Sequence, residues 1–331
     1  MKINYKNKKG WFYTSLLVFL IGYIVWMITM PGKNYDKPMP ALTAEQKQLS
    51  QTLRNHVIHV ASKAHNYQHL AELDKSAQYI ESELIADGYK INQQFFMDHK
   101  VHNIEVVLEP SEKVTKTVVI GAHYDSAGEA VGANDNGTGV AVLLELAKRF
   151  KQNFHSEHTR LRMVFFVNEE PPYFKTSLMG SAKYARLLKN YNEPIVAMYA
   201  FDELGRYSDE DGSQKYPFFL KPFNPSKGNF IGFVGNIHSR PLVEKTIETF
   251  RSEAQFPSQG IAGLQYIPGI DFSDHLNFYI YGWQALMITD TAFNRYQYYH
   301  TPQDTVDKIN FDRLAQLTDD LEKMFRTLHG F

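Results

Sequence analysis

The sequence predicts an α/β fold in which a central, mostly parallel mixed sheet is flanked by helices as a three-layer sandwich, preceded by one transmembrane helix. Two observations predict it. Short runs rich in Val, Ile and Phe alternate along the chain with longer segments whose apolar residues recur every three to four positions. Such alternation of strands and helices is typical of parallel sheets. Near the N-terminus, a long segment contains no charged residue.

That uncharged segment, residues 11–30, predicts a membrane anchor. Twenty helical residues span about 30 Å, the thickness of a hydrocarbon core. Lysines in the basic tail 1–10 predict that the N-terminus stays in the cytoplasm and that the rest of the chain is exported. We therefore expect a single pass through a bacterial cytoplasmic membrane, with the large domain periplasmic or extracellular. A cleaved signal peptide is disfavoured because Met30-Pro-Gly-Lys33 is a poor cleavage site.

Composition narrows the class of protein. The 331 residues have a net charge of −1, but residues 1–43 hold six lysines and one aspartate, so the rest is acidic. An acidic globular part argues against nucleic-acid binding. There is no cysteine, which excludes disulfides, thiolate metal ligands and lipoprotein attachment. The sequence holds no signal that indicates an oligomeric state.

The first half of the domain is predicted as helices followed by strands. Residues 31–43 contain three prolines and one glycine and are expected to be a linker, so that the domain spans 44–331. Thr43 and Gln46 fit a capping box that starts a helix reaching about residue 63. A second helix is expected over 74–86, and strands over 91–97, 103–108 and 118–122.

The second half continues the alternation. We expect helices near 140–150, from 177 onward, over 242–251 and over 311–328, and strands over 160–168, 195–201 and 283–289. Residues 205–229 are rich in Gly, Pro, Ser, Asp and aromatics and are too long for an ordinary connection. They are expected to form a loop insertion or lid over the site.

Six polar residues share one property: each lies just beyond, or shortly after, a predicted strand. In open α/β sheets the site lies outside the carboxyl ends of the strands, so these side chains are expected to meet there. Oxygen and imidazole ligands without thiolate suit zinc. Three ligating carboxylates would leave one positive charge of two divalent ions unbalanced, and a bridging hydroxide would neutralise it. The six are His123, Asp135, Glu169, Glu170, Asp202 and His300.

The motifs around these residues resemble peptidase family M28, the co-catalytic zinc metallopeptidases that include bacterial leucyl aminopeptidases. The resemblance covers roughly residues 50–325 and implies the fold of zinc-dependent exopeptidases. The combination of motifs is specific, although no single one is. The matching stretches are GAHYDS (121–126), GANDNG (132–137), NEE (168–170), MGS (179–181), FD (201–202), SDH (273–275) and YHT (299–301).

The resemblance implies a role for each residue. His123 and Asp202 would bind one zinc ion, Glu170 and His300 a second, and Asp135 both. Glu169 would be the general base that takes a proton from the bridging water and passes it to the leaving amine.

Asp125 would accept a hydrogen bond from His123 and fix its tautomer; a turn residue is the alternative reading of Asp125. Asp304 can equally be a cap of the last segment. Some family members have a tyrosine beside the Ser-Asp-His motif to stabilise the oxyanion, and here Tyr266 or a tyrosine of 296–299 would replace it. Six other histidines are expected at the surface: His56, His59, His65, His69, His155 and His158.

The sequence thus predicts a membrane-anchored dinuclear zinc aminopeptidase that hydrolyses N-terminal peptide bonds of peptide substrates through a metal-bridged hydroxide. Other divalent metals fit the same ligands. Two alternatives remain. The first is a single-zinc aminoacyltransferase similar to glutaminyl-peptide cyclotransferases, which share much of the motif pattern. The second is a peptidase-like ectodomain that binds without catalysis, although such domains are expected to have lost ligands.

Overall fold

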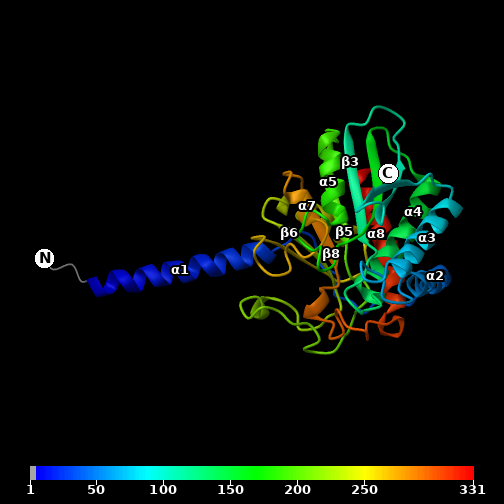
Figure 1. Ribbon diagram of the computed structural model, residues 1–331. Coiled ribbons are helices and arrows are strands. Elements are labelled where there is room, and N and C mark those ends of the chain that lie inside the picture. Colours follow the sequence, from blue (N-terminus) through cyan, green and yellow to red (C-terminus); the bar gives the residue numbers. More distant parts are fainter. Residues whose placement is uncertain (1–4) are drawn as a thin grey trace.

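The computed structural model describes residues 5–331, with side chains from residue 10 onward. Part of the expected basic tail, residues 1–4, lies outside the described residues. Most of the chain folds into a domain from which one long helix projects (Figure 1). The helices are α1 (Tyr5–Ile28), α2 (Ala44–Val60), α3 (Leu70–Ala86), α4 (Gly139–Asn153), α5 (Gly180–Asn190), α6 (Arg240–Glu253), α7 (Leu276–Tyr279) and α8 (Phe311–His329).

Within residues 5–331, the strands form a single eight-stranded sheet in the order β1-β2-β4-β3-β5-β8-β6-β7. Its centre is parallel, because β3 pairs in parallel with β4 and β5, and β5 with β8. β1, β2 and the β6–β8 pairing are antiparallel. The strands are β1 (Asn92–Phe96), β2 (Val101–Leu108), β3 (Lys116–His123), β4 (Thr159–Phe166), β5 (Ile195–Phe201), β6 (Ile231–Asn236), β7 (Ser258–Gly263) and β8 (Ala285–Thr289).

Helices cover both faces of the sheet, as the alternation predicted. Alternate residues of β3 point to opposite faces, so Ile120 joins the larger core and Val119 the smaller one. The larger core is closed by α2, α3, α4, α6 and α8, and the smaller one by α5 and α7 (Figure 1). The predicted three-layer α/β fold with a mixed central sheet is confirmed.

Local sequence signals determine where several of the helices begin and end. In α2, the backbone N–H of Gln46 donates to Thr43 Oγ1 at 3.2 Å and the Gln46 side chain accepts from the Thr43 N–H at 3.1 Å, as the capping box predicts. Helix α8 ends at His329 and is capped by Gly330, whose φ of 71° glycine adopts more readily than residues with a Cβ. Helix α3 begins at Leu70, four residues earlier than expected.

Strands β6 and β7 were not predicted, and their sequences explain why. They read IGFVGN and SQGIAG, with glycines where strands usually carry branched side chains. The glycines of β7 are needed because α1 packs on this strand. A Cβ at Gly263 would lie 2.6 Å from Met27 Sδ, and one at Gly260 would lie 2.7 Å from Met30 Cγ.

Helix α1 is long and apolar enough to cross a membrane over Gly10–Ile28. Its C-terminal end is fixed to the domain by two arginines of α6. Arg240 donates to the carbonyls of Trp26 at 2.7 Å and Thr29 at 3.0 Å, and its guanidinium lies 4.1 Å from the centre of the Trp26 indole. Arg251 donates to the carbonyls of residues 30–32 at 2.8–3.3 Å.

The residues expected as a linker follow the surface of the domain. Asn34 Oδ1 accepts the backbone N–H of Ser258 at 2.7 Å, at the start of β7, and the Pro40 carbonyl accepts from the Gln316 side chain at 2.8 Å. In this structure α1 and the domain are therefore joined through a packed segment.

Candidate active site

Each predicted site residue lies at the carboxyl edge of the sheet. His123 is the last residue of β3, Asp202 follows β5 directly, and Glu169 and Glu170 come shortly after β4. Asp135 lies in the irregular turn Ala133–Thr138 between β3 and α4. These five side chains are buried, whereas His300, which lies beyond β8, is exposed. The backbone around the buried five must therefore be held by protein groups.

Two asparagines hold the turn that carries Asp135. Asn136 donates through Nδ2 to the Phe201 carbonyl at 2.8 Å and accepts the Glu203 N–H through Oδ1 at 3.2 Å. Asn134 Oδ1 accepts the Gly205 N–H at 2.9 Å. These bonds tie the turn to the residues that follow β5, and so fix Asp135 relative to Asp202.

Asp304 holds the other side of this turn. Its carboxylate accepts the backbone N–H groups of Asn134 and Asp135 and the hydroxyl of Tyr296, all at 2.8–3.1 Å. The side chain is fully buried. Asp304 therefore supports the site and does not cap the last helix, where Asn310 accepts the N–H of Arg313 at 3.1 Å.

The side chains of the two histidines and three of the acids converge as two sets. In the first, His123 Nε2 lies 3.2 Å from Asp135 Oδ1 and 3.7 Å from Asp202 Oδ1. In the second, His300 Nε2 lies 3.0 Å from Asp135 Oδ2 and 3.2 Å from Glu170 Oε1. Asp135 is shared, and each of its two oxygens belongs to a different set.

These separations fit metal ions. Ligand atoms about 2.1 Å from a tetrahedral zinc ion lie roughly 3.4 Å from one another, close to the spacing within both sets. Ligand atoms of His123, Asp135 and Glu170 all lie within 4.8 Å of one another. Glu170 Oε1 is buried and accepts no hydrogen bond from the described residues, as expected of an oxygen that faces a cation. The donor set therefore fits zinc.

The buried charges of the site would also be stabilised by a bound cation. Burial raises the pKa of Glu170 to about 8, and the neighbouring Asp135 adds to the rise. Burial and the neighbouring acid Glu170 raise the pKa of Glu169 well above its usual range. Burial opposes protonation of His300, but Asp135 and Glu170 raise its pKa to about 10. Carboxylates this crowded bind protons or metal ions in preference to remaining bare.

Asp125 lies behind His123 in an arrangement that differs in detail from the expected one. His123 Nδ1 donates to the backbone carbonyl of Asp125 at 3.0 Å, while the Asp125 carboxylate oxygen is 3.7 Å away. That carboxylate accepts the backbone N–H groups of Glu169 and Glu170 at 3.0 and 3.1 Å. Asp125 thus orients His123 through its backbone and positions the two glutamates through its side chain.

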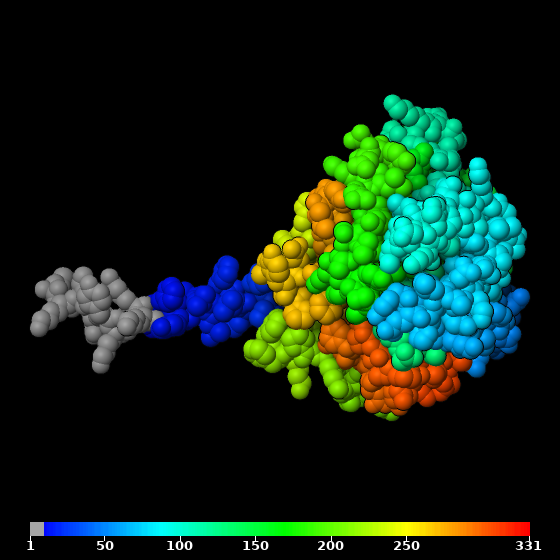
Figure 2. All heavy atoms as spheres, in the orientation of Figure 1, coloured from blue at the N-terminus to red at the C-terminus, as the bar shows by residue number. Residues whose placement is uncertain are grey.

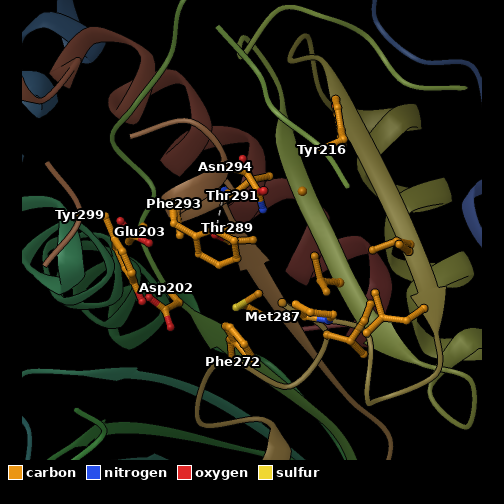
Figure 3. Close-up of a pocket in the computed structure, with 18 of the residues that line it drawn as sticks. Asp202, Glu203, Tyr216, Phe272, Met287, Thr289, Thr291, Phe293, Asn294 and Tyr299 are labelled. Atoms are coloured by element: carbon orange, nitrogen blue, oxygen red, sulfur yellow. Dashed lines mark hydrogen bonds between the residues drawn. The ribbon is translucent and has the colours of Figure 1, made fainter. Parts of the chain in front are cut away.

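A cavity of about 230 Å³ leads to these two sets of side chains. Asp135, Glu169, Glu170, Asp202 and His300 lie at one side. Figure 3 shows Phe272, Met287 and Phe293 gathered at its centre, with Asp202 and Tyr299 to one side and Tyr216 on the other. The cavity is therefore mainly apolar, with its charged groups at one end.

Two groups of sequence expectations need correction. His56 and His65 were expected at the surface but are buried. His56 Nδ1 lies 2.8 Å from the Tyr79 hydroxyl and its Nε2 lies 3.2 Å from Glu145, so partners on two neighbouring helices satisfy it.

Tyr266 is 85% exposed and does not line the cavity, whereas Tyr299 does and stacks on His300 with ring centres 3.7 Å apart.

Comparison with known proteins gives a relative of matching length. A model of peptidase family M28 matches residues 103–324. The chain is 33% identical over 316 residues to the uncharacterized protein YfbL of Escherichia coli (strain K12), a match that covers 93% of this chain and 94% of YfbL. Further relatives are named as aminopeptidases or probable zinc metalloproteases.

Solved structures share the fold. The Legionella pneumophila LapA aminopeptidase matches with a TM-score of 0.65 at 18% identity, covering 88% of this chain and 77% of LapA. A glutaminyl cyclase of Bacteroides thetaiotaomicron matches with a TM-score of 0.62 at 15% identity, covering 89% of this chain and 98% of the cyclase. Identities this low relate the folds alone. On the family model and the full-length relative, this chain belongs to peptidase family M28.

Proposed function

We propose that the protein is a membrane-anchored dinuclear zinc aminopeptidase that hydrolyses the N-terminal bond of peptides. The observation that carries the proposal is the sharing of Asp135 between two ligand sets. His123 and Asp202 would complete one zinc site, and Glu170 and His300 the other. When bound, two zinc ions polarise the scissile carbonyl and lower the pKa of water.

Glu169 is the general base of this proposal. Its carboxyl lines the cavity beside the ligands, and its backbone is fixed by Asp125. It takes a proton from the attacking water and returns it to the leaving amine. A buried carboxyl whose pKa is raised by its surroundings, as this one is, transfers protons near neutral pH more readily than an exposed one.

Tyr299 is the proposed donor to the oxyanion. The stacking of its ring on His300 holds it in the cavity. Burial and the nearby carboxylate of Asp135 keep its pKa above the ordinary value for tyrosine, so the hydroxyl keeps its proton and can donate it in a hydrogen bond.

The apolar cavity supports recognition of an apolar first residue. Phe272, Met287 and Phe293 would surround that side chain, while the free amino group faces the carboxylates at the charged end. Glu203 lines the same end and is not a proposed zinc ligand, so an acid remains there to face the amino group, which supports cleavage from the N-terminus rather than from the C-terminus.

The test uses the full-length protein in detergent. We expect two zinc ions per chain by elemental analysis, and release of the first residue from leucyl peptides. A Gln-initiated peptide distinguishes the cyclotransferase alternative, since cyclisation removes ammonia from it without shortening it. One zinc ion and a cyclised product would replace the proposal with that alternative. Bound zinc without either product would favour a binding ectodomain.

A further inference from the structure

The membrane helix and the catalytic cavity meet in this structure. Ile28, the last residue of α1, lines the same cavity as the metal ligands, together with Leu220 of the 205–229 segment and Ile267 of the loop after β7. If α1 crosses the bilayer as proposed, its last residues mark the outer surface of the membrane. The cavity then lies beside that surface, because Arg240 and Arg251 fix the end of α1 to the domain.

Two loops beside the end of α1 expose large apolar side chains. Phe218, in the 205–229 segment, is 87% exposed, and Tyr266, in the loop after β7, is 85% exposed. Phe223 and Leu264 are exposed in the same two loops. Figures 1 and 2 show both loops, yellow-green and gold, next to the base of α1 on the side of the domain that faces along the helix. We call these two loops the anchor-side loops.

The composition of residues 214–227 suits one particular environment. This stretch holds three phenylalanines, one tyrosine and three lysines (Lys215, Lys221 and Lys227), and no acidic residue. Aromatic side chains favour the boundary between headgroups and hydrocarbon, and lysines beside them are attracted to anionic lipid. If the loop faced water alone, the large apolar side chain of Phe218 would be exposed to water with no surface to pack against.

We infer that the anchor-side loops rest on the outer leaflet of the bilayer that α1 crosses, with Phe218 and Tyr266 inserted at the lipid interface. The cavity then opens at the membrane surface, and the peptides that reach it are those held at that surface. This last consequence rests on the proposed peptidase activity, whereas contact of the loops with lipid rests only on the proposed membrane anchor.

The absence of cysteine makes the inference directly testable. Single-cysteine variants F218C and Y266C of the full-length protein are labelled with an environment-sensitive fluorophore. They are reconstituted into two sets of vesicles, whose lipids carry a nitroxide quencher either near the headgroup, to report on 218 and 266, or near the middle of the acyl chain, to report on 18. V18C, in the middle of α1, is the reference for the bilayer. Y191C, whose position is 68% exposed at the end of α5, is the reference for water.

We expect the labels at 218 and 266 to be quenched several-fold more than the label at 191, and to emit at shorter wavelength. Quenching at 218 and 266 no greater than at 191 would overturn the inference, and so would a label at 18 that the lipid does not quench. Because both test positions are exposed, substitution there leaves the core intact. The readout requires no catalysis, so repeating it with E169Q separates this inference from the proposed enzymatic activity.

Discussion

The carboxylate of Asp304 accepts the backbone N–H of Asp135 at 3.1 Å, although the two residues are 169 positions apart in the chain. Asp304 also accepts the N–H of the preceding residue, so its two oxygens clamp the turn that presents the shared carboxylate. Groups that orient metal ligands in this way affect affinity for the metal nearly as much as the ligands do.

Replacement of Asp304 by Ala should therefore weaken zinc binding without removing a ligand. We expect the affinity for zinc to fall roughly 10- to 100-fold, because the turn loses its clamp. Competition with a chromophoric chelator measures the change. Asp307→Ala is the control, since that exposed carboxylate contacts its surface neighbours Thr305 and Lys308 and lies outside the site. Equal affinities in the two variants would contradict the supporting role.

Replacement of Glu169 by Gln should affect zinc content and kcat differently from replacement of the adjacent Glu170. Glu169→Gln should retain zinc while kcat falls roughly 100- to 10,000-fold, the usual contribution of a general base. Glu170→Gln should lose zinc, because a ligand is weakened. Zinc content and kcat on a leucyl amide are measured together, with Glu129→Gln, at an exposed position, as control. Undiminished turnover in Glu169→Gln would remove it as the base.

The sharing of Asp135 predicts unequal effects on metal stoichiometry. Asp202→Ala removes one oxygen from one set, so the second zinc ion should remain. Asp135→Ala removes a ligand from both sets and should leave less than one ion per chain. Elemental analysis after dialysis gives the ratio, with Asp209→Ala, at an exposed position, as control. Two ions retained without Asp135 would show that the sites do not share it.

Stability should depend on pH through His275. This side chain is fully buried, its Nε2 donates to the Ile270 carbonyl at 2.8 Å, and burial lowers its pKa to about 4. The unfolded chain, with a histidine pKa near 6.5, binds more protons between these values. The stabilisation is therefore complete above about pH 6.5 and is lost as the pH falls toward about 4.

Between pH 7 and pH 5 the loss attributable to His275 should be about 2 kcal/mol. Denaturant unfolding at both pH values, with excess chelator so that metal loss does not contribute, measures it. His275→Gln should show a correspondingly smaller difference between the two pH values than the wild type. His155→Gln, at an exposed position, should match the wild type. Parallel losses in all three proteins would show that other groups set the pH dependence.

The cavity walls predict a preference for apolar first residues. Each additional buried methylene stabilises by about 0.8 kcal/mol, so kcat/KM for leucyl substrates should exceed that for alanyl substrates by roughly 10- to 50-fold. Lysyl substrates should be poorer, because the ammonium would lie against Phe272 and Met287. Met287→Ala should reduce the ratio of kcat/KM for leucyl substrates to kcat/KM for alanyl substrates. A preference for lysine would contradict this description of the cavity.

Much of the site could be predicted because its residues follow strands. A parallel strand places the residue after its carboxyl end at one common edge, so the positions of His123, Glu170 and Asp202 follow from the strand pattern alone. The helix–strand alternation likewise predicts the layers of the fold. These features depend on local sequence and on the handedness of the chain.

The features that could not be predicted from the sequence depend on contacts between distant segments. The glycines of β7 make room for Met27 and Met30, and Gly235 of β6 makes room for Val243 of α6. His56 is buried because Tyr79 and Glu145 satisfy both of its nitrogens, and neither partner is near it in the chain. No local pattern encodes such pairings.

The packing of residues 27–34 against β7 has a practical consequence for producing the protein in soluble form. β7 is the outermost strand of the sheet, and these residues shield it. A fragment that starts at residue 44 would bare a strand edge lined by glycines, together with the apolar surface that Met27 and Met30 occupy. Exposed edges pair with one another, so such a fragment is prone to self-association and aggregation. A usable soluble version needs new side chains over β7 as well as removal of the hydrophobic helix.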